Sequence, residues 1–368
     1  MTAVIAVTSG KAEVGRSLLS ANLAHYLNHK GYHTGLLVAG SDKAIWSVSP
    51  DSTWPNIIGG RLSLDSAIFR DTFGIDLMVT HDHGHALGNL STQTAEHLAD
   101  PMGILDAYAY LIVDMAAGIS APAIACSLAA TETIMVLTPD TPALTSGYEW
   151  LAKLARHGFS GPINIVLNQI QKPALAQSVY VRFRDLAQKR LKVQSNLWGS
   201  LTRETFPDPE APLQRPLVDA FPQSKLLQEI RIIGDRLLAE QPPENQTTPL
   251  KTFWQHFIHH LENLPALPYI PPIRQSTPKE SHQEAAQSGS TAGPEPSGPR
   301  PSLEAAQSFQ QLSDQMAAIL DELKSIRKLL ENSPPSRTAA DQLKDERNGI
   351  RIQMDFDDFI ARQEETSH

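Results

Sequence analysis

The residues with the clearest chemical potential form one run near the start of the chain, Ser9-Gly10-Lys11-Ala12-Glu13-Val14-Gly15-Arg16-Ser17. A loop that binds phosphate uses glycines for close backbone approach, a cation for the terminal phosphates and a hydroxyl for magnesium. Gly15, Arg16 and Ser17 supply these groups, although lysine is the usual cation at the position of Arg16. Glu13 stands where anionic phosphates would bind, unless its side chain points to solvent. The run is therefore an altered phosphate loop.

The segments on either side of this loop predict the elements that hold it. The apolar run Ala3–Val7 precedes it and is typical of a buried parallel strand, and residues 18–27 follow with helical periodicity. Phosphate loops occur between a strand and a helix, because the N-terminus of the helix attracts anions. The context therefore supports the phosphate-loop interpretation.

The first 240 residues alternate short apolar runs with helical patterns. This alternation indicates βαβ units, so we expect an α/β fold with a mostly parallel sheet and helices on both faces. The predicted strands are Val4–Val7, Thr34–Val38, Ile75–Val79, Tyr110–Val113, Thr133–Leu137 and Ile163–Leu167, and the predicted helices lie near residues 17–30, 91–107, 120–130, 141–157, 174–191 and 223–239.

Composition restricts the classes of function. The formal net charge of −9 argues against broad electrostatic binding to nucleic acid. The single cysteine, Cys126, fits a reducing compartment, and its Ala-rich apolar surroundings predict a buried core thiol and not a nucleophile. No leader pattern precedes the first strand, and no apolar run reaches the ~18 residues of a membrane span. We therefore expect a cytoplasmic protein.

Further segments are predicted after the domain formed by residues 1–240. Residues 241–265 contain a short linker and an amphipathic helix, and residues 266–302 have the Pro, Ser and Gly content of a disordered linker. Residues 303–333 repeat apolar side chains at spacings of three and four, which predicts a coiled-coil helix of about three heptads. Residues 334–368 form a polar tail. The heptad positions are Phe309, Leu312, Met316, Ile319, Leu323, Ile326 and Leu330.

These peripheral features each have more than one interpretation. The heptad helix (303–333) either joins a second copy or a partner protein, or docks on its own globular domain. In the tail, the apolar and acidic run Ile350–Ile360 is either a docking peptide that folds on binding or a tail without a function. The cluster His81-Asp82-His83 with His85 suits zinc or nickel, but a polar loop is favoured because no cysteine or second cluster supports it.

Several segments together resemble the MinD/ParA superfamily of P-loop proteins. The loop carries a second basic residue, Lys11, at its start, as does the deviant phosphate loop of that family. The most specific match is Tyr110–Ser120, which is similar to the family's Walker B strand and the loop after it. Within the superfamily the chain looks most like FlhG-type proteins (FleN, YlxH), which control flagellar number and placement. The other similar segments are Asn22-Leu23-Ala24, Gly60–Ile68, Leu137–Thr145, Val166–Gln169 and Phe221–Ser224.

The resemblance implies a role for each residue of the loop. In the family, the lysine that corresponds to Lys11 reaches across a dimer interface to the phosphates of the partner's nucleotide. Val14, Gly15 and Arg16 correspond to the residues that cradle the phosphates, and Ser17 to the magnesium ligand. The expected cofactor is therefore ATP or ADP with Mg²⁺, or none if the site is inactive.

Two residues outside the loop complete the implied site. Asp114 corresponds to the Walker B aspartate, which orders the magnesium shell and is catalytic together with Lys11 in an active enzyme. Asn168 corresponds to the asparagine that reads the adenine base. Each also has a simpler interpretation, because an Asp at a strand end caps turns and an Asn readily forms them.

The sequence departs from the family pattern around the same site. Ala12 and Glu13 replace glycines, and Arg16 replaces a lysine, which is not a conservative change in a tight cradle. The triplet Ala39-Gly40-Ser41 replaces the Asp-x-Asp that positions the attacking water and the magnesium shell, although a shift of one residue would bring Asp42 there. We expect ATP hydrolysis to be absent or very weak. Nucleotide binding without hydrolysis is left open.

The amphipathic stretch Leu250–Leu264 follows the core, where family members often carry a membrane-targeting helix. Its Trp and Phe content fits an interfacial helix, but its polar face is poor in Lys and Arg, which weakens attraction to anionic lipid. Docking on the protein's own core is favoured over membrane contact, and three histidines make either state sensitive to pH. Its apolar face contains Leu250, Phe253, Trp254, Phe257, Ile258 and Leu261.

The sequence thus leads to the hypothesis of a MinD/FlhG-like regulator that helps to position or assemble a bacterial surface structure, the flagellum first. It would act through protein contacts, as a homodimer or with a partner, in the cytoplasm or peripherally at the inner face of the membrane or the cell pole. The alternatives are an active ATPase that dimerises around ATP, and an accessory protein of a polysaccharide-synthesis or secretion complex. DNA partitioning is disfavoured by the acidic charge and the lack of a basic helix.

Overall fold

The computed structural model describes residues 2–39, 56–57, 61–80, 98, 101–159, 161–171, 173–207, 215–240 and 249–264. Several predicted features lie outside these residues. They are the histidine cluster (81–85), residues 40–42 after the second strand, the linker 266–302, the heptad helix (303–333) and the tail (334–368). The predictions made for these segments remain predictions.

The described part of the chain forms one eight-stranded sheet with the order β3-β4-β2-β5-β1-β6-β7-β8. All neighbouring strands run parallel except the antiparallel pair β3–β4. β1 lies near the middle, so the loop that follows it reaches the centre of the carboxyl edge of the sheet. The strands are β1 Ala3–Thr8, β2 Thr34–Ala39, β3 Phe69–Thr72, β4 Ile75–Thr80, β5 Tyr110–Met115, β6 Glu132–Leu137, β7 Ile163–Ile170 and β8 Ser195–Thr202.

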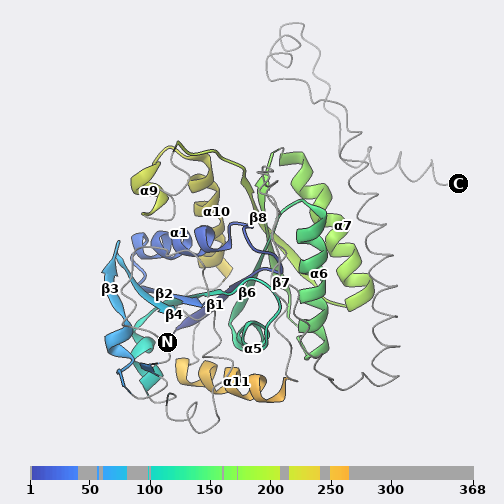
Figure 1. Ribbon diagram of the computed structural model, residues 1–368. Helices are drawn as coiled ribbons and strands as arrows, with labels where there is room; N and C mark the ends of the chain where they lie inside the picture. Colours follow the sequence, from blue (N-terminus) through green and yellow to red (C-terminus); the bar gives the residue numbers. More distant parts are fainter. Residues whose placement is uncertain are drawn as a thin grey trace, which may run out of the picture. The chain divides into compact units, whose positions relative to one another are not determined.

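Helices cover both faces of this sheet (Figure 1). α1 and α10 pack together on one face, α5 and α11 pack together on the other, and α6 and α7 lie beside the β6–β8 end. The helices are α1 Arg16–His29, α5 Ala121–Ala129, α6 Thr141–Arg156, α7 Pro173–Leu191, α9 Leu217–Ala220, α10 Lys225–Glu240 and α11 Leu250–Asn263, with 3₁₀ helices η1 Asp65–Ala67 and η2 Pro101–Ala107.

Side chains at the N-termini of α5 and α6 explain where these helices begin. The Ser120 hydroxyl accepts a hydrogen bond from the Ala123 N–H, and the Asp140 carboxylate accepts one from the Ala143 N–H. Each helix also has a proline in its first turn, where no intrahelical partner for an N–H is needed. These caps fix the position of Asp140 directly beside the loop described below.

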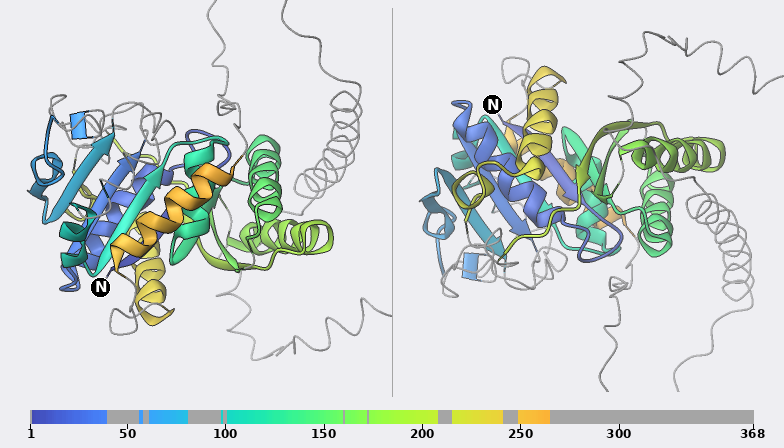
Figure 2. Two further views of the ribbon diagram at one scale, coloured as in Figure 1. Left: turned by 90° about the horizontal axis from the view of Figure 1, so that it is seen from below. Right: turned by 90° about the horizontal axis from the view of Figure 1, so that it is seen from above.

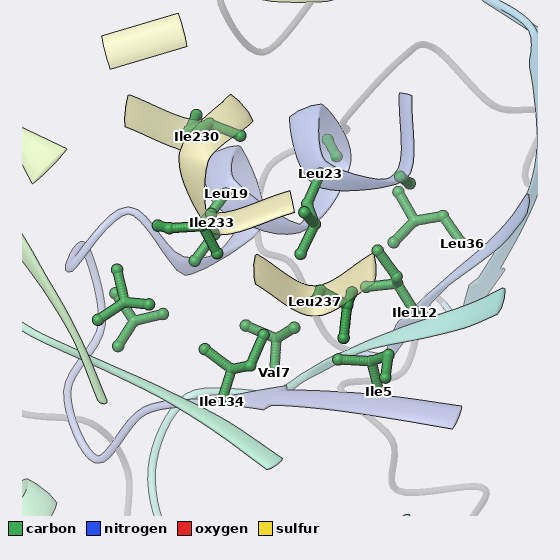
Figure 3. Close-up of a cluster of buried hydrophobic side chains, with 14 of the residues drawn as sticks. Ile5, Val7, Leu19, Leu23, Leu36, Ile112, Ile134, Ile230, Ile233 and Leu237 are labelled. Atoms are coloured by element: carbon green, nitrogen blue, oxygen red, sulfur yellow. The ribbon is translucent and has the colours of Figure 1, made fainter. Parts of the chain in front are cut away.

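The hydrophobic core lies between α1, α10 and the central strands (Figure 3). Ile5 and Val7 of β1 alternate toward this face, and the helices contribute side chains at spacings of three and four. Gly234 allows the helices to approach, because a Cβ there would lie 2.3 Å from the Tyr26 ring. The helical contributors labelled in Figure 3 are Leu19, Leu23, Ile230, Ile233 and Leu237.

The structure confirms the predicted α/β class with a mostly parallel sheet and helices on both faces. All six predicted strands are present, but β3 and β8 were not predicted. Both are edge strands: β8 alternates polar residues along its half-exposed length, and β3 is a short strand in a hairpin with β4. The helix predicted at 91–107 is wrong for residues 101–107, which form a 3₁₀ helix that contains Pro101 and Gly103.

Candidate functional site

The loop of residues 9–15 connects β1 to α1 at the carboxyl edge of the sheet. Packing against backbone requires the first of its glycines, and backbone conformation requires the second. A Cβ on Gly10 would lie 2.3 Å from the Ser146 carbonyl oxygen in α6, and a Cβ on Gly15 would lie 2.1 Å from the Asn168 side chain. Gly15 also has a φ of 83° and precedes the first residue of α1. The loop is therefore enclosed by α6 and the end of β7.

Arg16, the first residue of α1, forms a buried ion pair with Asp114 at the end of β5. The Arg16 Nε donates to Asp114 Oδ1 at 2.5 Å, and the two side chains are 7% and 0% exposed. The Ser20 hydroxyl also lies 3.4 Å from Asp114 Oδ1. Arg16 Nη2 is 3.5 Å from the Ser17 hydroxyl, so the guanidinium lies between the Asp114 carboxylate and Ser17. In an enclosed site such a pair neutralises a carboxylate that water does not reach.

Two polar atoms of this pair have no partner within the described residues. They are Arg16 Nη1 and Asp114 Oδ2, and both are buried. The guanidinium therefore does not present Nη1 to solvent in this arrangement.

The second basic residue of the loop, Lys11, is paired within its own chain. Lys11 Nζ donates to Asp140 Oδ1 at 2.9 Å, and Lys11 is only 4% exposed. Burial raises the pKa of Asp140, but hydrogen bonds from Thr138, Lys11 and the Ala143 N–H outweigh it and hold that pKa below its usual value. Asp140 thus neutralises Lys11 and caps α6 at the same time.

Residues at the end of β7 bind the backbone of the loop. Asn168 Nδ2 donates to the Val14 carbonyl oxygen at 2.7 Å, and Gln169 Nε2 donates to the Glu13 carbonyl oxygen at 3.0 Å. The Asn168 Oδ1 accepts the Gln169 N–H at 2.7 Å. Both Asn168 polar groups are therefore used within the protein. The Glu13 side chain is exposed, although its backbone has a φ of 61°.

The strands explain why these groups meet. Asp114 is paired with Val7 of β1 on one side and with Val38 of β2 on the other, so its carboxylate lies at the centre of the carboxyl edge. Ala39 is the last residue of β2 and carries no carboxylate. In the described part of β2, nothing acidic reaches the loop, and residues 40–42 lie outside the described residues.

The structure brings all the predicted site residues together around one loop: Lys11, Val14, Gly15, Arg16, Ser17, Asp114 and Asn168. Three participants were not predicted: Ser20, Asp140 and Gln169. Asp140 has the sequence signal of a helix cap, an acidic residue just before a helical pattern that begins with proline. Its pairing with a lysine 129 residues earlier has no local signal.

Magnesium does not fit these residues as they are arranged. Mg²⁺ requires near-octahedral oxygen ligands at about 2.0–2.1 Å. Here Asp114 Oδ1 already accepts from Arg16, Asp114 Oδ2 is buried, and the same guanidinium contacts the Ser17 hydroxyl. Among the described residues no group of three or more His, Cys, Asp or Glu side chains could hold a metal ion elsewhere. The arrangement is that of an internally neutralised phosphate loop.

The amphipathic helix α11 lies against the core and not apart from it. Leu250, Trp254 and Phe257 are buried, and the helix packs on α5 and η2 (Figure 2). The Leu250 N–H donates to the Asp106 carboxylate at 2.6 Å, which fixes the start of the helix. This packing is the docking on the protein's own core that the sequence favours over membrane contact. No helix within the described ranges is long and apolar enough to cross a membrane.

Comparisons with known proteins agree with this architecture, although no protein-family model matches the chain. The chain is 25% identical over 263 residues to the antiactivator FleN of Pseudomonas aeruginosa, which covers 70% of this chain and 94% of FleN. It is 28% identical over 195 residues to the flagellum site-determining protein YlxH of Helicobacter pylori, covering 52% of this chain and 66% of YlxH. The cell division ATPase MinD of Pyrococcus furiosus has a similar fold, with a TM-score of 0.50 and 20% identity over 65% of this chain and 100% of that structure. The chain thus has the fold of MinD and is similar in sequence to the FlhG-type proteins FleN and YlxH.

Proposed function

We propose that this protein is an FlhG-like regulator that positions a bacterial surface structure, the flagellum, or controls its assembly. The sequence similarity that supports this proposal spans 94% of FleN, a protein named for antagonising activation, and reaches YlxH, which is named for determining flagellar sites. Similarity over nearly the whole length of FleN favours a shared kind of task over a shared fold alone.

We further propose that ATP hydrolysis is lost or very weak. The buried Arg16–Asp114 pair is the single observation that carries this proposal. Phosphoryl transfer depends on cations and carboxylates that are free to hold phosphate, metal and water. In this site Lys11 and Arg16 are both neutralised by carboxylates of the same chain, and no acidic side chain from the described part of β2 reaches the loop.

Without a nucleotide cycle, regulation depends on binding to other proteins. We propose that the heptad helix (303–333) and the tail (334–368) supply those contacts, either between two copies or with a partner of the surface structure. The core domain then serves as the folded platform that carries them. Peripheral contact with the membrane through α11 requires that its buried face leave α5, so we expect it to be absent while the helix is docked.

A phosphate-release assay with ATP and Mg²⁺ tests the loss of hydrolysis. We expect the purified protein to release no phosphate above the rate without enzyme, while the MinD of Pyrococcus furiosus, a named ATPase, provides the positive control. Phosphate release that disappears in Asp114→Ala would contradict the proposal and favour an active ATPase.

Deletion of the gene tests the cellular role. We expect deletion to change the number or the position of flagella, which electron microscopy measures. The Arg16→Lys variant is compared in the same strain. Unchanged flagella with a defect in surface polysaccharide or secretion would contradict the flagellar assignment. It would favour the accessory-protein alternative instead.

A further inference from the structure

The guanidinium of Arg16 contacts both of the groups that the family resemblance assigns to magnesium. Its Nε donates to Asp114 at 2.5 Å, and its Nη2 lies 3.5 Å from the hydroxyl of Ser17. One organic cation therefore connects the carboxylate and the hydroxyl. The contacts come from a planar group on α1 and not from a diffusible ion.

The charge balance of the site requires a cation at this position. Asp114 is fully buried between β1 and β2, where an unpaired carboxylate is strongly unfavourable. Arginine suits this role, because its guanidinium stays protonated at all physiological pH values and tolerates burial better than an ammonium group. Unlike a metal ion, it also cannot dissociate from the protein.

The surrounding loop is held by contacts within the same chain. Asn168 and Gln169 hold the carbonyl groups of Val14 and Glu13, and Lys11 is paired with Asp140. The remaining N–H groups at Arg16 Nη1 are buried. A nucleotide phosphate therefore meets a loop whose two cationic side chains are already paired with carboxylates of the same chain.

We propose that the Arg16 guanidinium is a permanent replacement for the magnesium ion and holds the loop closed without nucleotide or metal. The inference rests on the proposed function, because it gives the physical basis for the loss of hydrolysis. It predicts that the protein does not alternate between nucleotide-bound and nucleotide-free states. Its contacts with partner proteins are then insensitive to ATP.

Manganese, a paramagnetic substitute for magnesium, provides the test. The water-proton relaxation of Mn²⁺ with ADP is measured with and without protein. We expect the wild-type protein to leave the relaxation unchanged. We expect Arg16→Lys to bind Mn²⁺–ADP at least about tenfold more tightly than the wild type does. Adding Ser17→Ala to Arg16→Lys should abolish the gain.

Two results would overturn the inference. One is stoichiometric binding of Mn²⁺–ADP by the wild-type protein that disappears in Ser17→Ala. The other is a folded Arg16→Lys variant that gains no metal binding, because Arg16 would then not be what excludes the ion. Metal binding by the wild type without phosphate release would overturn only this inference, whereas phosphate release would contradict the proposed function as well.

A measurement on the wild-type protein covers the case in which Arg16→Lys does not fold. In a ¹⁵N-labelled sample, the Nε–H of Arg16 should give a downfield signal that exchanges slowly with water, because it is buried against Asp114. Asp114→Asn should shift this signal and thereby assign it. We expect millimolar Mg²⁺ to leave it unchanged. Loss of the signal on addition of Mg²⁺ would show that the metal displaces the guanidinium and would overturn the inference.

Discussion

Replacing Arg16 by methionine should destabilise the domain strongly, because it leaves the Asp114 carboxylate buried without its cation. Asp114 is 0% exposed and the Arg16 side chain 7%, so solvent screening offers little compensation. Removing one partner of such a pair costs about 3–5 kcal/mol of the free energy of unfolding. For a domain of this size class, each kcal/mol lowers Tm by ~2–4 °C, so the melting temperature should fall by roughly 6–20 °C.

Urea unfolding followed by circular dichroism measures this effect, with the midpoint shifting and the m-value unchanged. The matched control is Arg184→Met on α7, where an exposed arginine pairs with Asp185 and the side chains are 43% and 61% exposed. That pair should contribute less than about 1 kcal/mol. The double variant Arg16→Met with Asp114→Leu removes both charges and should recover most of the lost stability, because no unpaired ion remains.

The outcome that refutes this reasoning is a small effect of Arg16→Met alone. If that variant loses no more stability than Arg184→Met, Asp114 does not depend on Arg16 for its charge compensation. The same conclusion follows if the double variant is less stable than Arg16→Met, because removing the buried carboxylate would then bring no relief.

Three further predictions concern the parts of the domain away from this pair. Trp254→Ala should weaken the docking of α11 on α5 by about 3–5 kcal/mol, which hydrogen exchange would show as faster exchange in residues 250–263 only. The control Gln255→Ala changes an exposed residue of the same helix and should have no effect. Equal hydrogen exchange in the two variants would contradict this prediction. Burial raises the pKa of Cys126 to about 12, so thiol reagents near neutral pH should modify it only after unfolding, and rapid modification of the native protein would be inconsistent with this burial. Burial, together with the neighbouring His259 and His256, lowers the pKa of His260, so the docked helix α11 favours neutral His260. Acidification below about pH 6.5 should therefore loosen the docking and speed hydrogen exchange in α11. Hydrogen exchange in α11 that does not depend on pH, or that depends on pH equally in His260→Gln, would disprove this.

The fold was largely predictable because its central strands are buried on both faces. β1, β5 and β6 appear in the sequence as almost uninterrupted apolar runs, and α6 and α10 keep a clear 3.6-residue period. The edge strand β8 lacks this signal, because Ser195, Asn196 and Ser200 interrupt its apolar residues. Burial on both faces, and not strand propensity, therefore made the central strands predictable, whereas the edge strands β3 and β8 were not.

The candidate site was predictable in its membership but not in its connections. The spacing of residues in the loop identified Lys11, Arg16 and Ser17, and a strand end identified Asp114. The two ion pairs join residues 129 and 98 positions apart, and they depend on how strands and a helix cap meet in space. A sequence shows that a cation has been exchanged, but only the fold shows which carboxylate it neutralises.

The two loop glycines are poor indicators of nucleotide binding in this chain. Such glycines are usually ascribed to the close approach of phosphate, yet Gly10 is constrained by the Ser146 carbonyl and Gly15 by Asn168. Packing and backbone conformation alone would keep both glycines, whether or not the chain binds nucleotide. The informative positions are instead those that depart from the family pattern, Ala12, Glu13 and Arg16. A loop that keeps Gly10 and Gly15 but has changed at other signature positions is what the proposed loss of hydrolysis, with retention of the fold, predicts.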